Sequence, residues 1–207
     1  MKNLKLLLLT TTLFISLSCS VTKNQKKGKT LPETFNYEAK FTTVKTVIII
    51  PFELNGISKN FLFDTGADYS VIQRDSTLGK AENYDGASNR EMKLGNEYVK
   101  SMKIGNVDFK NTYAVNGNLI GLKEQITNFG GILGQPIISK ANWLIDYPNK
   151  KIRVSNQNLV DETFKTIQIK RKGGAPYTYI SINGTKHKVI IDFGSSSEFN
   201  LPKESKL

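Results

Sequence analysis

Two short stretches of the chain place an aspartate two residues before a glycine, directly after a run of apolar residues. They read Asp64-Thr65-Gly66-Ala67 and Asp192-Phe193-Gly194-Ser195. Two carboxyl groups held a few ångströms apart cannot both ionise easily, so they share one proton. The ionised carboxylate can then act as a general base on water while its protonated neighbour supports an oxygen that gains charge. Such a pair would activate water without a metal or another cofactor.

The two stretches belong to a longer internal repeat with a constant offset of 128 residues. The segments 51–67 and 179–195 align without a gap. In each copy an Asn-Gly dipeptide, which favours tight hairpin turns, precedes the aspartate by the same distance. These dipeptides are Asn55-Gly56 and Asn183-Gly184. The repeat therefore predicts two copies of one hairpin, each of which delivers an aspartate.

The remaining pattern between the two copies is that of short strands. The run Val47 to Ile50 is apolar without a break, as in a strand that is buried on both faces. Further short runs alternate with turn dipeptides, and the segment 136–140 is the one place where a short helix is expected. Many strands at short spacing predict an all-β fold that closes into a small barrel.

The first stretch resembles the active-site motif of retropepsin-like and pepsin-like aspartic proteases. In that family an apolar strand, here Phe61-Leu62-Phe63, leads into Asp-Thr/Ser-Gly and a small residue. A second element, Ile132-Leu133-Gly134, is similar to the closing segment that crosses behind the catalytic loop in the family. The resemblance implies a retropepsin-like closed β barrel over residues 41–155. It further implies a partial second lobe over 165–207, which repeats 37–79.

The resemblance also implies an activity, aspartic endopeptidase hydrolysis of peptide or protein substrates, without a metal or other cofactor. Asp64 would be the catalytic carboxylate, and Thr65 would bond across to the partner loop. Gly66, Ala67, Gly194 and Ser195 would support the two loops. The second aspartate is either Asp192 or Asp64 of a second copy in a symmetric homodimer. Phe193 departs from the family, which has Thr or Ser there, and so removes one cross-lobe hydroxyl.

Substrate capture in this family uses a mobile hairpin, the flap, between the catalytic loop and the closing segment. Residues 82–98 occupy that place. Tyr84, Asp85 and Gly86 would lie at or near its tip, although Tyr84 could equally be an ordinary surface tyrosine. The single histidine, His187, lies among lysines in the second hairpin and is expected to be exposed and idle. With one histidine and one cysteine, the sequence offers no credible zinc cluster.

The N-terminus has the pattern of an export signal. Two lysines precede an apolar run from Leu6 to Leu17, which ends close to Cys19, the only cysteine. Residues 1–19 resemble the signal peptide and lipobox of bacterial lipoproteins, in which this cysteine becomes lipidated. The alternative is a cleaved secretory signal with Cys19 incidental. If Cys19 is lipidated, residues 20–40 form a basic, polar tether that holds the protein at a membrane, facing the periplasm of a Gram-negative-type bacterium.

The formal charge of +11 suggests nucleic acid as a partner, but six of the lysines and no acid lie within residues 1–29. The other basic residues are scattered and form no stripe with interleaved aromatics, so a nucleic-acid-binding function is not expected. Two alternatives to an active protease stay open. One is a non-catalytic lipoprotein that binds peptides or a partner through a protease-derived lobe, and the other is a truncated, inactive fragment.

Overall fold

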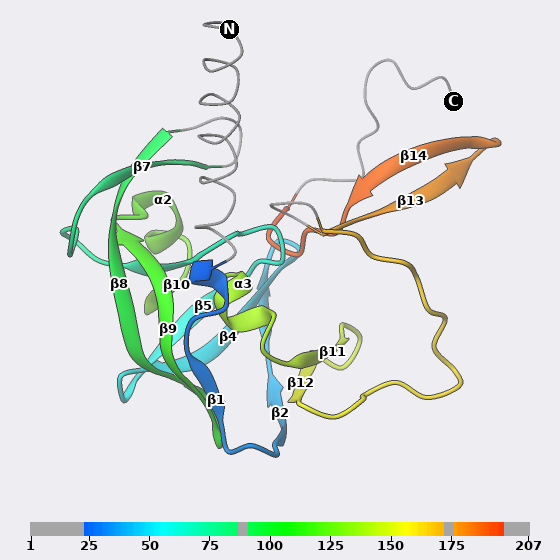
Figure 1. Cartoon of the computed structure of the whole chain (residues 1–207), viewed down its shortest axis with the longest axis horizontal. Helices are drawn as coiled ribbons and strands as arrows, with labels where there is room; N and C mark the ends of the chain where they lie inside the picture. Colours follow the sequence, from blue (N-terminus) through cyan, green and yellow to red (C-terminus); the bar gives the residue numbers. More distant parts are fainter. Residues whose placement is uncertain (1–22, 87–90, 172–175, 197–207) are drawn as a thin grey trace, which may run out of the picture.

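The computed structural model describes residues 23–86, 91–171 and 176–196 (Figure 1). Its elements are β1 (Lys29–Leu31), β2 (Asn36–Lys40), β3 (Thr42–Val44), β4 (Val47–Leu54), β5 (Ile57–Phe63), β6 (Ser70–Gln73), β7 (Glu82–Asp85), β8 (Glu91–Ile104), β9 (Val107–Gly117), α2 (Ile120–Lys123), β10 (Phe129–Leu133), α3 (Gln135–Ile138), β11 (Asn142–Asp146), β12 (Lys151–Ser155), β13 (Tyr177–Ile182) and β14 (Thr185–Ile190). The all-β prediction is confirmed, and α3 begins one residue before the predicted short helix.

The largest sheet returns on itself. Its pairings run β9-β6-β10-β5-β4-β8 and, because β8 also pairs with β9, the six strands form a closed ring. Strand β5 lies between β4, to which it is antiparallel, and β10, to which it is parallel. Large apolar side chains from these strands are fully buried inside the ring; among them are Ile50, Phe52, Phe61, Phe63 and Phe109. The ring thus gives β5, which leads to Asp64, support on both edges.

A second, three-stranded sheet packs against the same core, in the order β11-β12-β2. Ile152 and Val154 of β12 are buried in the main core cluster, and Tyr37 of β2 packs against it. The segment 20–40, which the sequence predicts as a tether, contains strands β1 and β2. Part of the predicted tether thus belongs to the fold. The reason in β2 is that its residues alternate between exposed and half-buried, and all five pair with β12.

The repeat appears in the structure as two hairpins of the same form. Asn55 and Asn183 both have φ of 50°, and the glycines that follow have φ of 87° and 79°. Two successive residues with positive φ are typical of a type I′ hairpin turn, which explains the Asn-Gly dipeptide in each copy. The second hairpin, β13–β14, forms a two-stranded sheet of its own and extends away from the ring at the upper right of Figure 1.

The predicted export signal and Cys19 lie outside the described residues. Within the described part of the chain, no helix is long and apolar enough to cross a membrane.

Candidate active site

The first aspartate directly follows β5, which pairs with β4 along one edge and β10 along the other. Phe61, Leu62 and Phe63 at the end of β5 are buried, so the chain enters the loop from a fixed position. The backbone N–H of Asp64 donates to the carbonyl of Leu133 at 3.0 Å. The closing segment thus lies beside the Asp64 loop, where the sequence resemblance places it.

Both aspartates sit in loops with the same internal hydrogen bond. The N–H of Gly66 donates to Oδ1 of Asp64 at 2.7 Å, and the N–H of Gly194 donates to Oδ1 of Asp192 at 2.8 Å. Asp64 accepts a further bond from the N–H of Ala67 at 3.0 Å. Each carboxylate is therefore oriented by the backbone of its own loop, and the one of Asp64 more firmly.

The two loops face each other, and the glycines show how close they come. A Cβ built on Gly66 would lie 2.9 Å from Cγ of Asp192. A Cβ built on Gly194 would overlap the carboxyl group of Asp64. Each glycine therefore leaves room for the aspartate of the opposite loop. The structure brings Asp64 and Asp192 together within one chain.

Proximity and burial change the acidity of Asp64. Burial is the largest cause that raises its pKa, and the negative charge of Asp192 is the second. A hydrogen bond with Asp192 raises the pKa further. The N–H groups of Gly66 and Ala67 oppose this shift because they stabilise the charged form. Together these effects raise the pKa of Asp64 to about 7. The pair can therefore hold a shared proton up to near-neutral pH.

The hydroxyl of Thr65 joins the two loops. Oγ1 donates to the carbonyl of Ile191 at 2.7 Å and accepts from the N–H of Phe193 at 3.1 Å. Phe193, at the matching position of the second loop, has no hydroxyl to return these bonds. Its ring instead lies near those of Phe63 and Tyr147. The connection between the loops is therefore asymmetric.

A buried glutamine that the sequence reasoning missed supports the first loop. Gln135, 2% exposed, follows the closing segment directly. Its Nε2 donates to the carbonyl of Thr65 at 2.7 Å, and its backbone N–H donates to the carbonyl of Ala67 at 3.0 Å. Arg171, from the segment that leads to β13, donates to its Oε1. The sequence signal was a polar residue directly after Leu133-Gly134.

The predicted flap region forms the hairpin β7–β8, whose tip at residues 87–90 lies outside the described residues. Asp85 and Gly86 come directly before this tip, and Asp85 is exposed. Tyr84 is half-buried, its ring lies edge-on to Tyr69 with centroids 5.9 Å apart, and its hydroxyl donates to Oδ1 of Asn96 at 2.8 Å. Since Tyr69 comes just after the Asp64 loop, this contact connects the hairpin to the site.

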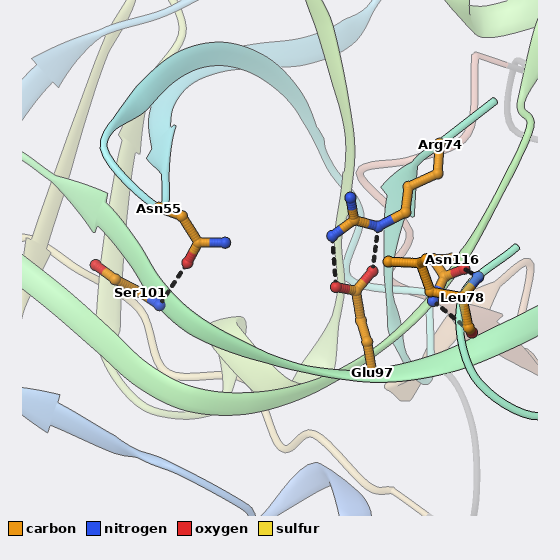
Figure 2. A network of polar contacts seen from close by, with 6 residues as sticks. All are labelled: Asn55, Arg74, Leu78, Glu97, Ser101 and Asn116. Atoms are coloured by element: carbon orange, nitrogen blue, oxygen red, sulfur yellow. Dashed lines mark hydrogen bonds and ion pairs between the residues drawn. The ribbon is translucent and has the colours of Figure 1, made fainter. Parts of the chain in front are cut away.

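Polar contacts tie β8 to neighbouring elements and the chain before β7 to β9 (Figure 2). The guanidinium of Arg74, next to β6, forms two hydrogen bonds with the carboxylate of Glu97 at 2.8 and 2.6 Å. Asn116, fully buried on β9, binds both the N–H and the carbonyl of Leu78. A side-chain oxygen of Asn55 accepts from the N–H of Ser101 at the other end of β8. These contacts hold β8 against the end of β6 and the β4–β5 turn, and hold the chain before β7 against β9.

The expectation for His187 was wrong. Its side chain is 8% exposed, and its Nε2 has no hydrogen-bond partner. The imidazole lies on β14, opposite Ile180 of β13. Among the described residues, no group of three or more histidine, cysteine or acidic side chains could hold a metal ion.

No protein-family model matches the chain, and no curated protein matches it in sequence. Among solved structures, the chain is similar to a retropepsin-like aspartic protease from Rickettsia conorii. The two share 20% sequence identity with a TM-score of 0.45, over 62% of this chain and 95% of that one. The geometry of the two aspartate loops, rather than this likeness, carries the chemistry proposed below.

Proposed function

We propose that the chain is an aspartic endopeptidase of the retropepsin-like kind, in which Asp64 and Asp192 of one chain form the catalytic pair. The observation that carries this proposal is the mutual fit of the two loops, in which each glycine makes room for the opposite carboxylate. The raised pKa of Asp64 supports it, because a shared proton needs one carboxyl that stays protonated near neutral pH.

In the proposed reaction, Asp64 holds the shared proton and Asp192, the more exposed of the two, is ionised. Asp192 takes a proton from a water molecule as the water oxygen attacks the peptide carbonyl carbon. Asp64 donates its proton to the carbonyl oxygen, which gives a neutral tetrahedral diol. The C–N bond then breaks, the amine leaves with the proton held by Asp192, and a hydroxyl of the diol returns a proton to Asp64. The pair ends with one proton, as it began.

A symmetric homodimer, with Asp64 of a second copy as the partner, is the alternative source of the second carboxylate. The intrachain pair is favoured because Thr65 already binds the backbone of the Asp192 loop at two points. A second Asp64 loop in the same place would have to displace that contact.

The decisive experiment is cleavage of a peptide library by the full chain in detergent, with Asp64→Asn and Asp192→Asn variants. Both substitutions should reduce kcat/KM by at least about a hundredfold, since each removes a proton-transfer group. Asp161→Asn, at an exposed aspartate that bonds only within its own turn, is the matched control and should cleave like the unchanged chain. Loss in Asp64→Asn alone, with a dimer by sedimentation, would favour the homodimer.

A non-catalytic, peptide-binding protein is the second candidate, and the absence of a hydroxyl at Phe193 favours it. This candidate predicts that library peptides bind the full chain but are never cut, at any pH between 4 and 8. Cleavage that survives Asp64→Asn would equally remove the aspartic mechanism.

We further propose that the protein is exported and anchored by a lipid on Cys19, facing the periplasm. The support is the sequence pattern alone, with two lysines, an apolar run and then the single cysteine. Mass spectrometry of the mature protein should find a lipidated Cys19 as its first residue. An unmodified N-terminus after this position would refute the anchor while leaving export open.

A further inference from the structure

Phe193 is the residue at which the second aspartate loop departs from the first. Its backbone N–H donates to Oγ1 of Thr65, and its half-buried side chain packs against the main core cluster. The ring centroid lies 6.3 Å from that of Phe63, edge-on, and 6.4 Å from that of Tyr147, nearly parallel. Both distances are typical of favourable aromatic pairs. The side chain therefore points into the first lobe and contacts it through apolar surface.

The hairpin that leads to Phe193 pairs with none of the described strands of the ring. Strand β5 is fixed by β4 and β10, whereas β13 and β14 make a two-stranded sheet of their own. Ile190, the last residue of β14, is 61% exposed. An isolated two-stranded hairpin is only marginally stable in water. The position of Asp192 must then depend mainly on contacts made by its own loop.

Those contacts come from two sources of different chemistry. Thr65 supplies a hydroxyl that binds the backbone of the second loop, whereas Phe193, at the matching position, has no hydroxyl to give in return. The ring of Phe193 makes a second connection by a different means, since it contacts Phe63, which precedes Asp64, and Tyr147, which follows β11. An aromatic side chain buries a large apolar area and loses little conformational entropy on doing so, which suits it to an anchor.

We propose that Phe193 is a positioning residue that anchors the Asp192 loop through its ring contacts with Phe63 and Tyr147 and so completes the carboxyl pair within one chain. The proposal rests on the function proposed above for its catalytic readout. Its structural content, the placement of Asp192 beside Asp64 by an aromatic contact, is independent of whether any peptide is cut. Phe193, which departs from the motif, is on this view the residue that holds Asp192 in place.

Three full-chain variants test the anchor: Phe193→Ala, Phe193→Leu and the control Phe164→Ala. The control removes an exposed ring from the chain between β12 and β13. The first readout is the titration of the Asp64 carboxyl carbon by NMR. In Phe193→Ala its pKa should fall from about 7 toward the ordinary 3.8, because the charge of Asp192 and part of the burial leave together. Phe193→Leu, which keeps the apolar bulk, should retain most of the shift, and Phe164→Ala all of it.

The second readout is peptide cleavage. Displacement of a catalytic group by about 1 Å can reduce a rate by about a hundredfold. Phe193→Ala should therefore lower kcat by about that factor with KM nearly unchanged, and Phe193→Leu should restore kcat to within about tenfold of the unchanged chain. Asp192→Asn removes the partner carboxylate altogether. The fall in the pKa of Asp64 in that variant is the reference with which the fall in Phe193→Ala is compared.

An unchanged Asp64 titration in Phe193→Ala would overturn the anchor, whatever the cleavage assay shows. If the unchanged chain cuts no peptide but the titration falls in Phe193→Ala and stays high in Phe193→Leu, the anchor holds and the protease proposal alone fails. A fall of the same size in Phe164→Ala would also overturn the proposal, because the effect would then not be specific to the ring contacts of Phe193.

Discussion

The two hairpins of this molecule share one sequence pattern and one turn geometry, but they have very different surroundings. Leu62 on β5 and Ile190 on β14 occupy the same position in the repeat, yet the first is 6% exposed and the second 61%. The first hairpin lies within the closed ring, where β3, β8 and β10 cover its edges. The second stands as a separate two-stranded sheet.

This difference shows that the same local design can deliver a carboxylate in two ways. In the first copy the sheet fixes the loop, and the loop only has to orient Asp64. In the second copy the loop is attached by the hydroxyl of Thr65, which comes from the first loop, and by its own Phe193 ring. The local turn is thus set by nearby residues, whereas the strength of its support is set by the strands around it.

The comparison predicts its largest contrast for truncation of the two matched apolar residues. Leu62→Ala removes a buried side chain and should destabilise the fold by about 2–5 kcal/mol, through lost burial and the cavity left behind. Ile190→Ala should change the free energy of unfolding by less than about 0.5 kcal/mol, as is usual for an exposed position. Urea unfolding of both variants measures the contrast. Equal losses would mean that the second hairpin is buried in solution and that the comparison is wrong.

The second prediction concerns the glycines at which the two loops meet. Gly194→Ala places a Cβ on the carboxyl group of Asp64, and Gly66→Ala places one on that of Asp192. Each should lower kcat/KM by about a hundredfold, because the carboxylates are pushed apart. Gly121→Ala is the matched control, since its Cβ would meet nothing within 4 Å. Two near-normal loop variants would show that the loops do not face each other during catalysis.

The sequence was sufficient to predict both hairpins because their determinants are local. The Asn-Gly turns, the apolar strand ends and the aspartates all lie within a single continuous segment, and the turn geometry depends on those residues alone. The unbroken apolar run from Val47 to Ile50 likewise predicted a stretch buried on both faces, and all four residues are buried in β4. Features that depend on neighbouring residues could therefore be predicted from the sequence.

Features that depend on distant partners could not be predicted in this way. The burial of Gln135 and its bonds to the Asp64 loop join residues about 70 positions apart. His187 sits among lysines, and nothing in that local pattern indicates that the fold covers its ring. Strands β1 and β2 are short and polar, so they read as a tether until their pairing partners β9 and β12 are known.

The third prediction concerns Gln135, whose side chain donates a hydrogen bond to the first loop. Gln135→Met keeps the side chain's length but leaves the carbonyl of Thr65 without its donor. A buried polar group without a partner costs about 1–3 kcal/mol, so the free energy of unfolding should fall by that amount. Gln125→Met is the control and should be nearly neutral, because this exposed glutamine donates to the carbonyl of Gly121, four residues before it. Equal stability of the two variants would remove Gln135 from the support of the loop.

The fourth prediction uses pH. Folding raises the pKa of Asp64 from 3.8 to about 7, so the folded state holds this proton more tightly than the unfolded chain. The contribution of Asp64 to stability is therefore fully present below pH 3.8 and is lost as the pH rises through 7. Cleavage should fall about tenfold per pH unit above 7, when the shared proton leaves. Asp64→Asn should lose this part of the pH dependence of unfolding, and an identical pH profile in this variant would contradict the assignment.

The smallest effect is expected where the two loops share a hydrogen bond. Thr65→Val removes the hydroxyl that donates to Ile191 and accepts from Phe193, while it keeps the shape of the side chain. The loss should be about 1 kcal/mol in unfolding and a severalfold fall in kcat, whereas Thr65→Ser, which keeps the hydroxyl, should restore both. Thermal unfolding and peptide cleavage measure these changes. If Thr65→Val matches the unchanged chain in both, the second loop is held by its aromatic ring alone, and the two copies of the design differ even more than their contacts indicate.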